Sequence, residues 1–303
     1  MRGSGFVQGA GSSPSNMEHR SLAASEVILC ADDYGLSPAV SHGILEALAA
    51  GRLSATGAMT NRPDWPRAAR ELAAFAGKNW LGVHLNLTLG APLAPMPAFA
   101  PGGALPAIGR IARARATDLP GSEIAAEISR QIDAFSQAMG RAPDFVDGHQ
   151  HVQALAAIRP HLFEQLSRLG LPASFWLRDS SDTSPRILRR RIQIPKAGMV
   201  AWLGRGFAAE ARAQGFAVND GFAGFSAFDA KADYGQAFDR YLVAPGSRHL
   251  IMCHPGHVDA ELKAVDPVLE SREQELAFLL SDRFKSLLAQ RNAALALPQP
   301  QRP

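Results

Sequence analysis

Apolar runs alternate with amphipathic segments along most of the chain, and this pattern predicts alternating strands and helices. Residues 26–32 (EVILCAD) form a continuous apolar run that suits a buried strand. In residues 81–87 the apolar positions alternate with His84 and Asn86, which is typical of a strand with two different faces. Further strands are predicted at residues 54–60, 143–150, 174–179 and 249–255.

Helical periodicity follows most of these strands. Ser37 and Pro38 are typical of an N-cap and a first helical residue, and Gly51 is typical of the end of the same helix. Further helices are predicted at residues 64–76, 121–140, 157–169, 198–214, 232–243 and 270–290.

The repeated strand–helix units predict an α/β fold with a parallel sheet. Six or seven strands separated by helices fit either a (β/α) barrel or an open doubly wound sheet. Neither a GxGxxG motif nor a phosphate-binding loop follows a predicted strand, which argues against a nucleotide-binding fold. We expect a single domain over residues 25–292, a segment over residues 1–24 that is disordered or in part a cloning remnant, and a loose tail over residues 293–303.

Composition narrows the range of partners. The net charge is +3, and basic residues concentrate in short runs at residues 110–116 and 186–196. Aromatic residues do not alternate with these basic residues, so we do not expect a nucleic-acid partner. The ordinary interpretation is a solvated face, and attraction to an anionic membrane surface is the alternative.

Cysteine content and hydropathy bear on the compartment. Cys30 and Cys253 lie in apolar runs, which argues against a disulfide framework and favours a reducing compartment. The sequence contains no stretch of 18 apolar residues and no apolar signal-peptide core near its start, so neither a transmembrane helix nor a secretion signal is expected. We expect a cytoplasmic protein, either free or peripheral at the inner face of the membrane.

Residues suited to acid–base or metal chemistry stand at or near the ends of the predicted strands. In parallel barrels, chemistry gathers at the carboxyl ends of the strands. Each residue alone could be a helix cap, a core histidine or part of a turn, but their coincidence at one end predicts a functional site. They are Asp32, Asp33, His84, Asn86, Asp147, His149, His151, Arg178, Asp179 and His254.

The adjacent carboxylates Asp32 and Asp33 need a compensating positive charge, because like charges side by side cost free energy. A divalent cation would supply that charge. One Asp and two His as ligands would leave a coordination position open for water, as in catalytic sites. Imidazole ligands favour Zn²⁺ or another late first-row metal over Mg²⁺, and the second Asp could then act as general base.

Four segments resemble, in order, the motifs of the YdjC-like carbohydrate deacetylases, the family of the chitooligosaccharide deacetylase. They are CADDYGLSPAVSHGILEA, GVHLNLTLGAPL, FVDGHQHVQ and MCHPGHVD, and the similarity runs over residues 27 to about 260. The resemblance implies a distorted (β/α) barrel with mostly parallel strands, related to the NodB-type deacetylases. It also implies metal-dependent removal of acetyl groups from amino sugars.

The resemblance implies a role for each residue that matches a family motif. Asp32 falls on the general base, and His254 falls on the histidine that we assign as general acid. Asp33, His84 and His149 fall on the ligands of one divalent ion. We expect zinc at this position, with magnesium, manganese and cobalt as alternatives.

This chain departs from the family pattern at two kinds of position. Gln150 and Gln153 replace histidines of the third motif, so neither position is expected to be essential. Tyr34 stands where phenylalanine is common. Several further residues are expected either to contact substrate or to support the ligands, namely His151, Arg178, Asp147, Asn86 and Tyr34.

A narrower resemblance concerns residues 201–225, which are similar to the hopanoid biosynthesis-associated branch of the family. That branch implies a lipid-linked substrate, an N-acetylglucosaminyl hopanoid. Trp202, Phe207, Phe222 and Phe225 would then help to form a lipid-facing groove, whereas on residue type alone they fit an ordinary core equally well.

Two other classes of function stay open on the sequence. One is a different metal-dependent hydrolase on the same scaffold, a phosphatase or an esterase. The other is a non-catalytic, metal-stabilised sugar-binding protein, against which the spare Asp32 and His254 argue. The sequence leaves open the oligomeric state and the choice between a soluble and a lipid-linked amino sugar.

Overall fold

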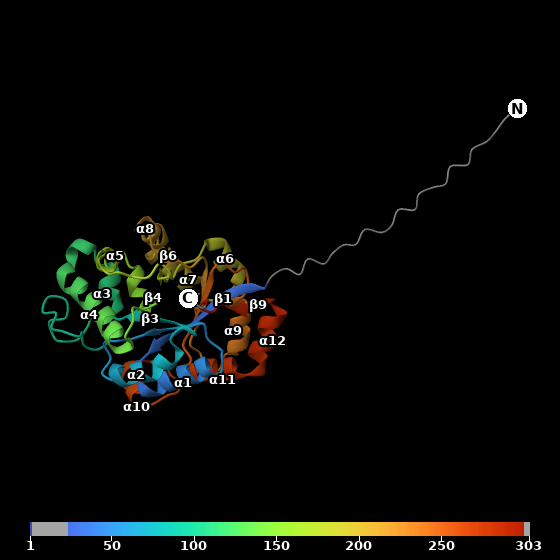
Figure 1. Ribbon diagram of the computed structural model, residues 1–303, viewed down its shortest axis with the longest axis horizontal. Coiled ribbons are helices and arrows are strands. Elements are labelled where there is room, and N and C mark those ends of the chain that lie inside the picture. Colours follow the sequence, from blue (N-terminus) through green and yellow to red (C-terminus); the bar gives the residue numbers. More distant parts are fainter. Residues whose placement is uncertain (2–23, 300–303) are drawn as a thin grey trace.

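A curled parallel sheet surrounded by helices forms the part of the chain described by the computed structural model, which comprises residues 1 and 24–299 (Figure 1). The strands follow the order β6-β5-β4-β3-β2-β1-β8-β7, and β9 pairs with β1. Every pairing between these strands is parallel, as predicted. The strands are β1 (Ser25–Tyr34), β2 (Ala55–Ala58), β3 (Trp80–Leu85), β4 (Phe145–Gly148), β5 (Trp176–Leu177), β6 (Ala217–Val218), β7 (Phe222–Ala223), β8 (His249–Cys253) and β9 (Ala293–Leu295).

The sheet curls into an open barrel because its two edge strands are close in sequence. Only residues 219–221 separate β6 from β7, and so short a connection spans at most about 14 Å. The side-chain amide of Asn219 crosses the gap, donating hydrogen bonds to the backbone carbonyls of Asp179 and Gly221 and accepting one from the backbone N–H of Asp179. The predicted distorted (β/α) barrel is confirmed.

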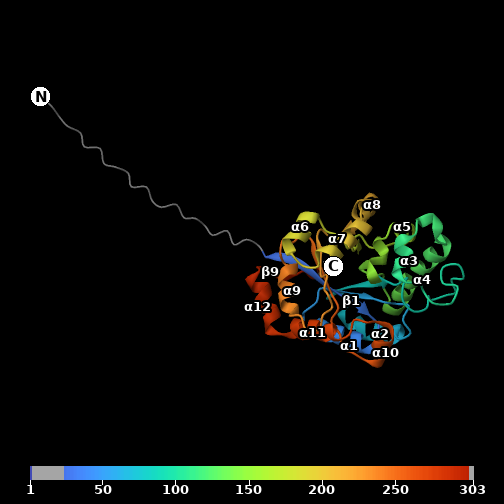
Figure 2. The ribbon, with the colours of Figure 1, turned by 180° about the vertical axis from the view of Figure 1, so that it is seen from behind.

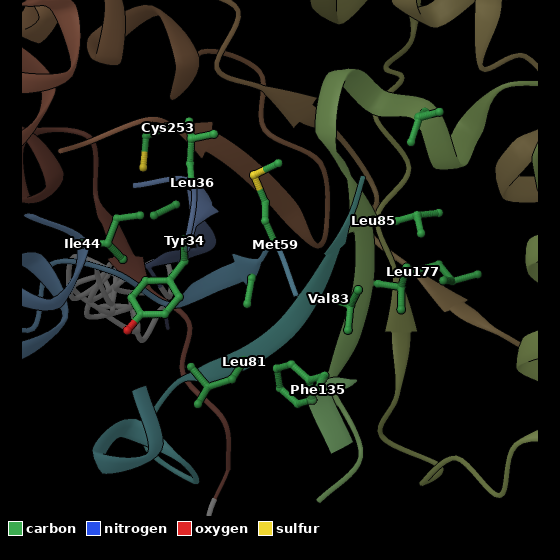
Figure 3. Packing of buried hydrophobic residues seen from close by; sticks show 14 of the residues in the cluster. Tyr34, Leu36, Ile44, Met59, Leu81, Val83, Leu85, Phe135, Leu177 and Cys253 are labelled. Carbon is green, nitrogen blue, oxygen red and sulfur yellow. The ribbon is translucent and has the colours of Figure 1, made fainter. Parts of the chain in front are cut away.

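The two faces of the sheet carry different layers. On the outer face, Leu81, Val83 and Leu85 of β3 pack among buried side chains of the helices, such as Phe135 (Figure 3). On the inner face, aromatic rings fill the barrel near the start of its strands, with the ring centroids of Phe145 and Trp176 4.4 Å apart. Two residues further along each chain segment, at Asp147 of β4 and at Arg178 just after β5, the inner face becomes charged.

Helices surround the sheet when the molecule is seen from either side (Figures 1 and 2). Among the described residues, every helix is too short or too polar to cross a bilayer. The helices are α1 (Pro38–Ala49), α2 (Trp65–Leu72), α3 (Ile108–Arg113), α4 (Gly121–Met139), α5 (Arg159–Arg168), α6 (Ser184–Arg190), α7 (Ile194–Leu203), α8 (Phe207–Ala213), α9 (Tyr234–Tyr241), α10 (Ala260–Val265), α11 (Glu270–Leu280) and α12 (Asp282–Gln290), with 3₁₀ turns at η1 (Ala73–Phe75), η2 (Ala116–Asp118) and η3 (His149–Ala154).

Two predicted helices are each broken into two. The helix expected at residues 198–214 separates into α7 and α8, because Gly206 adopts a left-handed conformation with φ of 88°. The helix expected at residues 270–290 separates at Ser281, whose extended backbone and side-chain oxygen cap the start of α12. The short helices α3, α6 and α10 were not predicted.

The structure tests the prediction for the C-terminal tail but describes little of the N-terminal segment. The expectation of a loose tail from residue 293 is wrong at its start, because residues 293–295 form β9 beside β1. Hydrogen bonding to an exposed stretch of β1 holds this short segment, although its sequence carries only a weak strand signal. The segment expected to be disordered lies outside the described residues, apart from residues 1 and 24.

Candidate metal centre and active site

Four strands bring charged side chains together at the carboxyl end of the barrel. Side chains two residues apart on a strand point to the same face, so Asp32 continues the inner face of Ile28 and Cys30, and Asp147 continues that of Phe145. His84 of β3 and Arg178, which directly follows β5, reach the same region. The predicted convergence of these four residues is present in the structure.

A bulge in β1 explains how two adjacent acids face one site. In a regular strand Asp32 and Asp33 would point to opposite faces. Between Ala31 and Tyr34 the pairing with β2 shifts register by one residue, and Asp33 adopts a left-handed conformation with φ of 69°. The extra residue turns the second carboxylate back toward the first.

Asp33, His84 and His149 lie close enough to share an ion. Their potential ligand atoms are all within 4.8 Å of one another. Asp33 Oδ1 lies 3.0 Å from Nδ1 of His149 and 3.3 Å from Nε2 of His84. His149 comes from η3, in which Gln150 and His151 both have positive φ.

A carboxylate fixes the orientation of His84. Asp147 Oδ1 lies 2.7 Å from Nδ1 of the ring, which leaves Nε2 directed at Asp33. Burial lowers the pKa of His84, but Asp147 and Asp32 outweigh it and raise the pKa to about 10. A carboxylate on the far nitrogen of an imidazole is the arrangement that makes histidine a strong metal ligand.

Glycine on the neighbouring strand makes room for this pair. A Cβ atom at Gly57 of β2 would lie 2.8 Å from Asp147 Oδ1 and 3.1 Å from the Cβ of His84. The weak strand signal of residues 54–60 therefore has a steric reason: a side chain here would push the ligand and its supporting carboxylate apart.

Two buried arginines each form an ion pair with one of the adjacent acids. Arg178 donates to both oxygens of Asp32, at 2.6 and 2.9 Å, and lies 2.8 Å from Asp147 Oδ2. Arg272 of α11 donates to Asp33 Oδ2 at 2.7 Å, and it also contacts Asp266. Burial raises the pKa of Asp33, but Arg272 and His149 hold it well below its usual range.

Arg272 is a site residue that the sequence did not reveal. It lies 239 residues from Asp33 in the chain, on a helix whose pattern looks like any other amphipathic segment. No motif surrounds it, so the only sequence signal is a buried-face position occupied by a charged residue. Glu275, one turn further along, was missed for the same reason.

His254 lies beside this charged cluster, just after β8. Its backbone N–H donates to the buried Glu275 at 2.6 Å, and its ring meets the edge of Phe228 at 5.2 Å. The ring atom Nδ1 has no hydrogen-bond partner in the described part of the chain. Burial lowers the pKa of His254 to about 4, although Asp33 and Asp32 act in the opposite direction.

Two predicted supporting residues lie away from the cluster. Tyr34 packs in the outer core, and its hydroxyl donates to the carbonyl of Ala68 in α2 (Figure 3). The expectation that Tyr34 contacts substrate or ligands is therefore wrong: it follows the bulge and returns to the outer face. Asn86 shapes its own loop, accepting from the backbone of Thr88 and Leu89.

His151 packs against aromatic rings, and the aromatic residues of the predicted lipid groove differ in their exposure. His151 meets the edges of Phe222 and Phe225, with centroids 5.7 and 5.6 Å away. Phe207, Phe222 and Phe225 are buried, whereas Trp202 is 65% exposed. The four side chains therefore do not share one exposed surface, and the lipid-facing groove stays a prediction.

The chemistry of the donor set fits a transition-metal ion. One carboxylate oxygen and two imidazole nitrogens, all nearly buried, converge on one point, and both Asp33 and His84 are held by groups behind them. A second group, Cys30, Asp32 and Asp147, already has Arg178 between its two acids. A third, His42, Glu46 and His257, lies on the surface.

The fold and this donor set define an α/β barrel protein with a candidate metal centre at the carboxyl edge of its sheet. The family model described as YdjC-like protein matches residues 26–290. The chain belongs to the YdjC-like family, which confirms the resemblance found in its motifs.

The curated relatives agree with this membership, and one solved structure agrees with the fold. A chitooligosaccharide deacetylase of Yersinia pestis (strain Pestoides F) is 31% identical over 275 residues, covering 89% of this chain and 96% of that protein. Another, of Enterobacter sp. (strain 638), is 38% identical over 150 residues, covering 48% of this chain and 57% of that protein. A structure from Enterococcus faecalis V583, described as a cellobiose-phosphate cleavage protein, has a TM-score of 0.68 at 23% identity and covers 91% of this chain and 98% of that one, which supports the fold. A family 4 carbohydrate esterase from Streptomyces lividans matches at a TM-score of 0.46 and 13% identity, covering 92% and 96%.

Proposed function

We propose that this protein is a carbohydrate deacetylase that hydrolyses the acetamide of an N-acetylglucosamine-type amino sugar. The observation that carries the proposal is a separate carboxylate, Asp32, which Arg178 holds beside a complete set of candidate metal ligands. A binding site would need the ligands Asp33, His84 and His149 but no spare acid. The names of the curated relatives support the same reaction.

The three ligands would hold one divalent ion, and their two imidazoles favour zinc over magnesium. When bound, such an ion lowers the pKa of water and polarises a carbonyl oxygen. Asp32 accepts the proton of the attacking water, because Arg178 holds its carboxylate in one orientation and leaves lone pairs on each oxygen free.

In this proposal His254 protonates the leaving nitrogen. An amide nitrogen leaves only after it has gained a proton. Burial lowers the pKa of His254, so a proton on its ring would be given up readily; we propose that the ring takes up the proton released through Asp32 and passes it to the nitrogen. The C–N bond breaks, the water oxygen stays on the acetyl carbon, and the products are acetate and a free amine.

The acetylated sugar is either a soluble oligosaccharide or the head of a glycolipid, since both present the same acetamide. Phosphatase and esterase activities use similar metal sites, so the products distinguish them. The test is to incubate the zinc-loaded protein with N-acetylated chitooligosaccharides and measure acetate, with p-nitrophenyl phosphate and p-nitrophenyl acetate in parallel.

Two substitutions separate the roles of the adjacent acids. Asp32→Asn is expected to retain bound metal and to lose turnover by roughly 10²- to 10⁴-fold, because only the base is removed. Asp33→Ala is expected to lose both metal and turnover, whereas Asp133→Asn, an exposed acid on α4, should change neither. Normal turnover in Asp32→Asn would refute its role as base. Phosphate release without acetate release would replace the deacetylase proposal, as would a chelator that lowers only thermal stability.

A further inference from the structure

Exposed apolar side chains gather on α6, α7 and the turn between them. Among the described residues, eight large apolar side chains are exposed, and four of these lie between residues 188 and 202. The four are Leu188, Ile194, Met199 and Trp202, with Trp202 65% exposed. We call these helices and their turn, residues 184–203, the α6–α7 face.

Helix α7 is apolar on both of its sides. Ala197 and Val200 pack into the protein, while Met199 and Trp202, three residues apart, share the outward side. Lys196 is the only charged residue in the helix. A surface helix normally turns polar residues to water, so this helix has an outward side suited to a second apolar environment.

The charge of the segment has one sign. Residues 186–205 contain six basic residues and no acidic residue. In the described part of the chain, Arg189, Arg191 and Arg205 are exposed and make no ion pair. The neighbouring acids Asp182 and Glu210 are already paired with other arginines.

We propose that the α6–α7 face docks on the surface of an anionic lipid bilayer. Apolar side chains that include tryptophan, flanked by unpaired arginines, are the combination that binds the interface of such a membrane. Helices α6, α7 and α8 lie on one side of the molecule, opposite α1, α2 and α10 (Figures 1 and 2).

A short chain of contacts links this face to the site. Lys196 of α7 donates to the carbonyl of Ser226, and its ammonium lies 4.3 Å from the ring centroid of Phe228. Phe228 in turn meets His254. Docking would therefore bring His254 near the membrane. That position suits an amino sugar carried by a lipid, an inference that rests on the proposed function.

The experiment measures binding of the full chain to vesicles, without substrate. Vesicles of phosphatidylcholine alone are compared with vesicles of phosphatidylcholine and phosphatidylglycerol in equal parts, by co-sedimentation and by tryptophan emission. Trp65 and Trp176 are buried and Trp80 is half-buried against the inner core, so a blue shift that is lost in Trp202→Ala would report on Trp202. We expect binding to the anionic vesicles that weakens with salt.

Substitutions on the face have matched controls elsewhere. Trp202→Ala and the pair Arg189→Gln with Arg191→Gln are expected to weaken vesicle binding several-fold, whereas Leu280→Ala and Arg113→Gln should not. Acetate release from a soluble chitooligosaccharide should be unchanged in Trp202→Ala, so failure of docking is distinguishable from failure of the catalytic proposal. Absence of wild-type binding, or equal binding by Trp202→Ala, would overturn the proposal. So would a dimer in sedimentation velocity that Trp202→Ala dissociates, since the face would then belong to a second copy.

Discussion

At the scale of single residues, each of the two adjacent acids has its own buried arginine. Arg178 grips Asp32 through both oxygens, while Arg272 holds only Oδ2 of Asp33. Asp33 therefore keeps Oδ1 for the two imidazoles. This difference in pairing, rather than any difference in residue type, is what would separate the proposed base Asp32 from the proposed ligand Asp33.

Glu275 is expected to make stability depend on pH. Burial raises its pKa to about 7, above the ordinary value of about 4.3 that it regains on unfolding. The folded state thus binds the extra proton, and the resulting stabilisation is complete at low pH and disappears as the pH rises through 7. Relative to Glu275→Gln, the wild type should lose up to about 3 kcal/mol of unfolding free energy between pH 5 and pH 8.

Denaturant unfolding of the two proteins at both pH values measures this difference. Glu275→Gln keeps an oxygen that can accept the backbone N–H of His254, so the comparison isolates the proton. Identical pH profiles for the wild type and the variant would contradict the prediction.

At the scale of elements, local irregularities position the site more than regular strands do. The bulge at the end of β1 turns the side chain of Asp33 toward the site, and His149 comes from η3, which contains two left-handed residues. Gly57 leaves β2 without a side chain where His84 and Asp147 meet. Sequence periodicity located the strands, but it assumes regular alternation and so could not foresee which adjacent residues would share a face.

The strand β9 is expected to stabilise the protein. It pairs with residues 25–27 of β1, and the backbone N–H of Ala296 donates to the carbonyl of Val27. A chain ending at residue 292 should lose about 1–3 kcal/mol of unfolding free energy, because the first residues of β1 would lose their hydrogen-bonding partner. A chain ending at residue 299 is the control, and equal stability of the two in denaturant would restore the interpretation of a loose tail.

At the scale of the whole molecule, closure of the barrel brings β6 and β7 together across residues 219–221. Asn219 is buried, and its amide satisfies three backbone groups on both sides of the gap. Arg178 follows β5 at this same edge, so the closure also holds the arginine that pairs with Asp32.

Asn219→Ala is expected to lower the free energy of unfolding by about 2–4 kcal/mol, since buried backbone groups would lose their partners. Amide hydrogen exchange should become faster in β6 and β7 before it changes in β1. Gln214→Ala, which removes an exposed amide at the end of α8, is the control. Unchanged exchange at the barrel edges would show that they hold together without this side chain.

The sequence alone was sufficient for the fold class, the family and most of the residues that converge at the site, because apolar periodicity and short motifs are local properties of the chain. Tertiary structure alone decided the partners of those residues. Arg272 reaches Asp33 from 239 residues away, Tyr34 turns outward although it adjoins the acid pair, and residues 293–295 join the sheet. Such contacts depend on which surfaces meet after the chain has folded, and no local pattern encodes them.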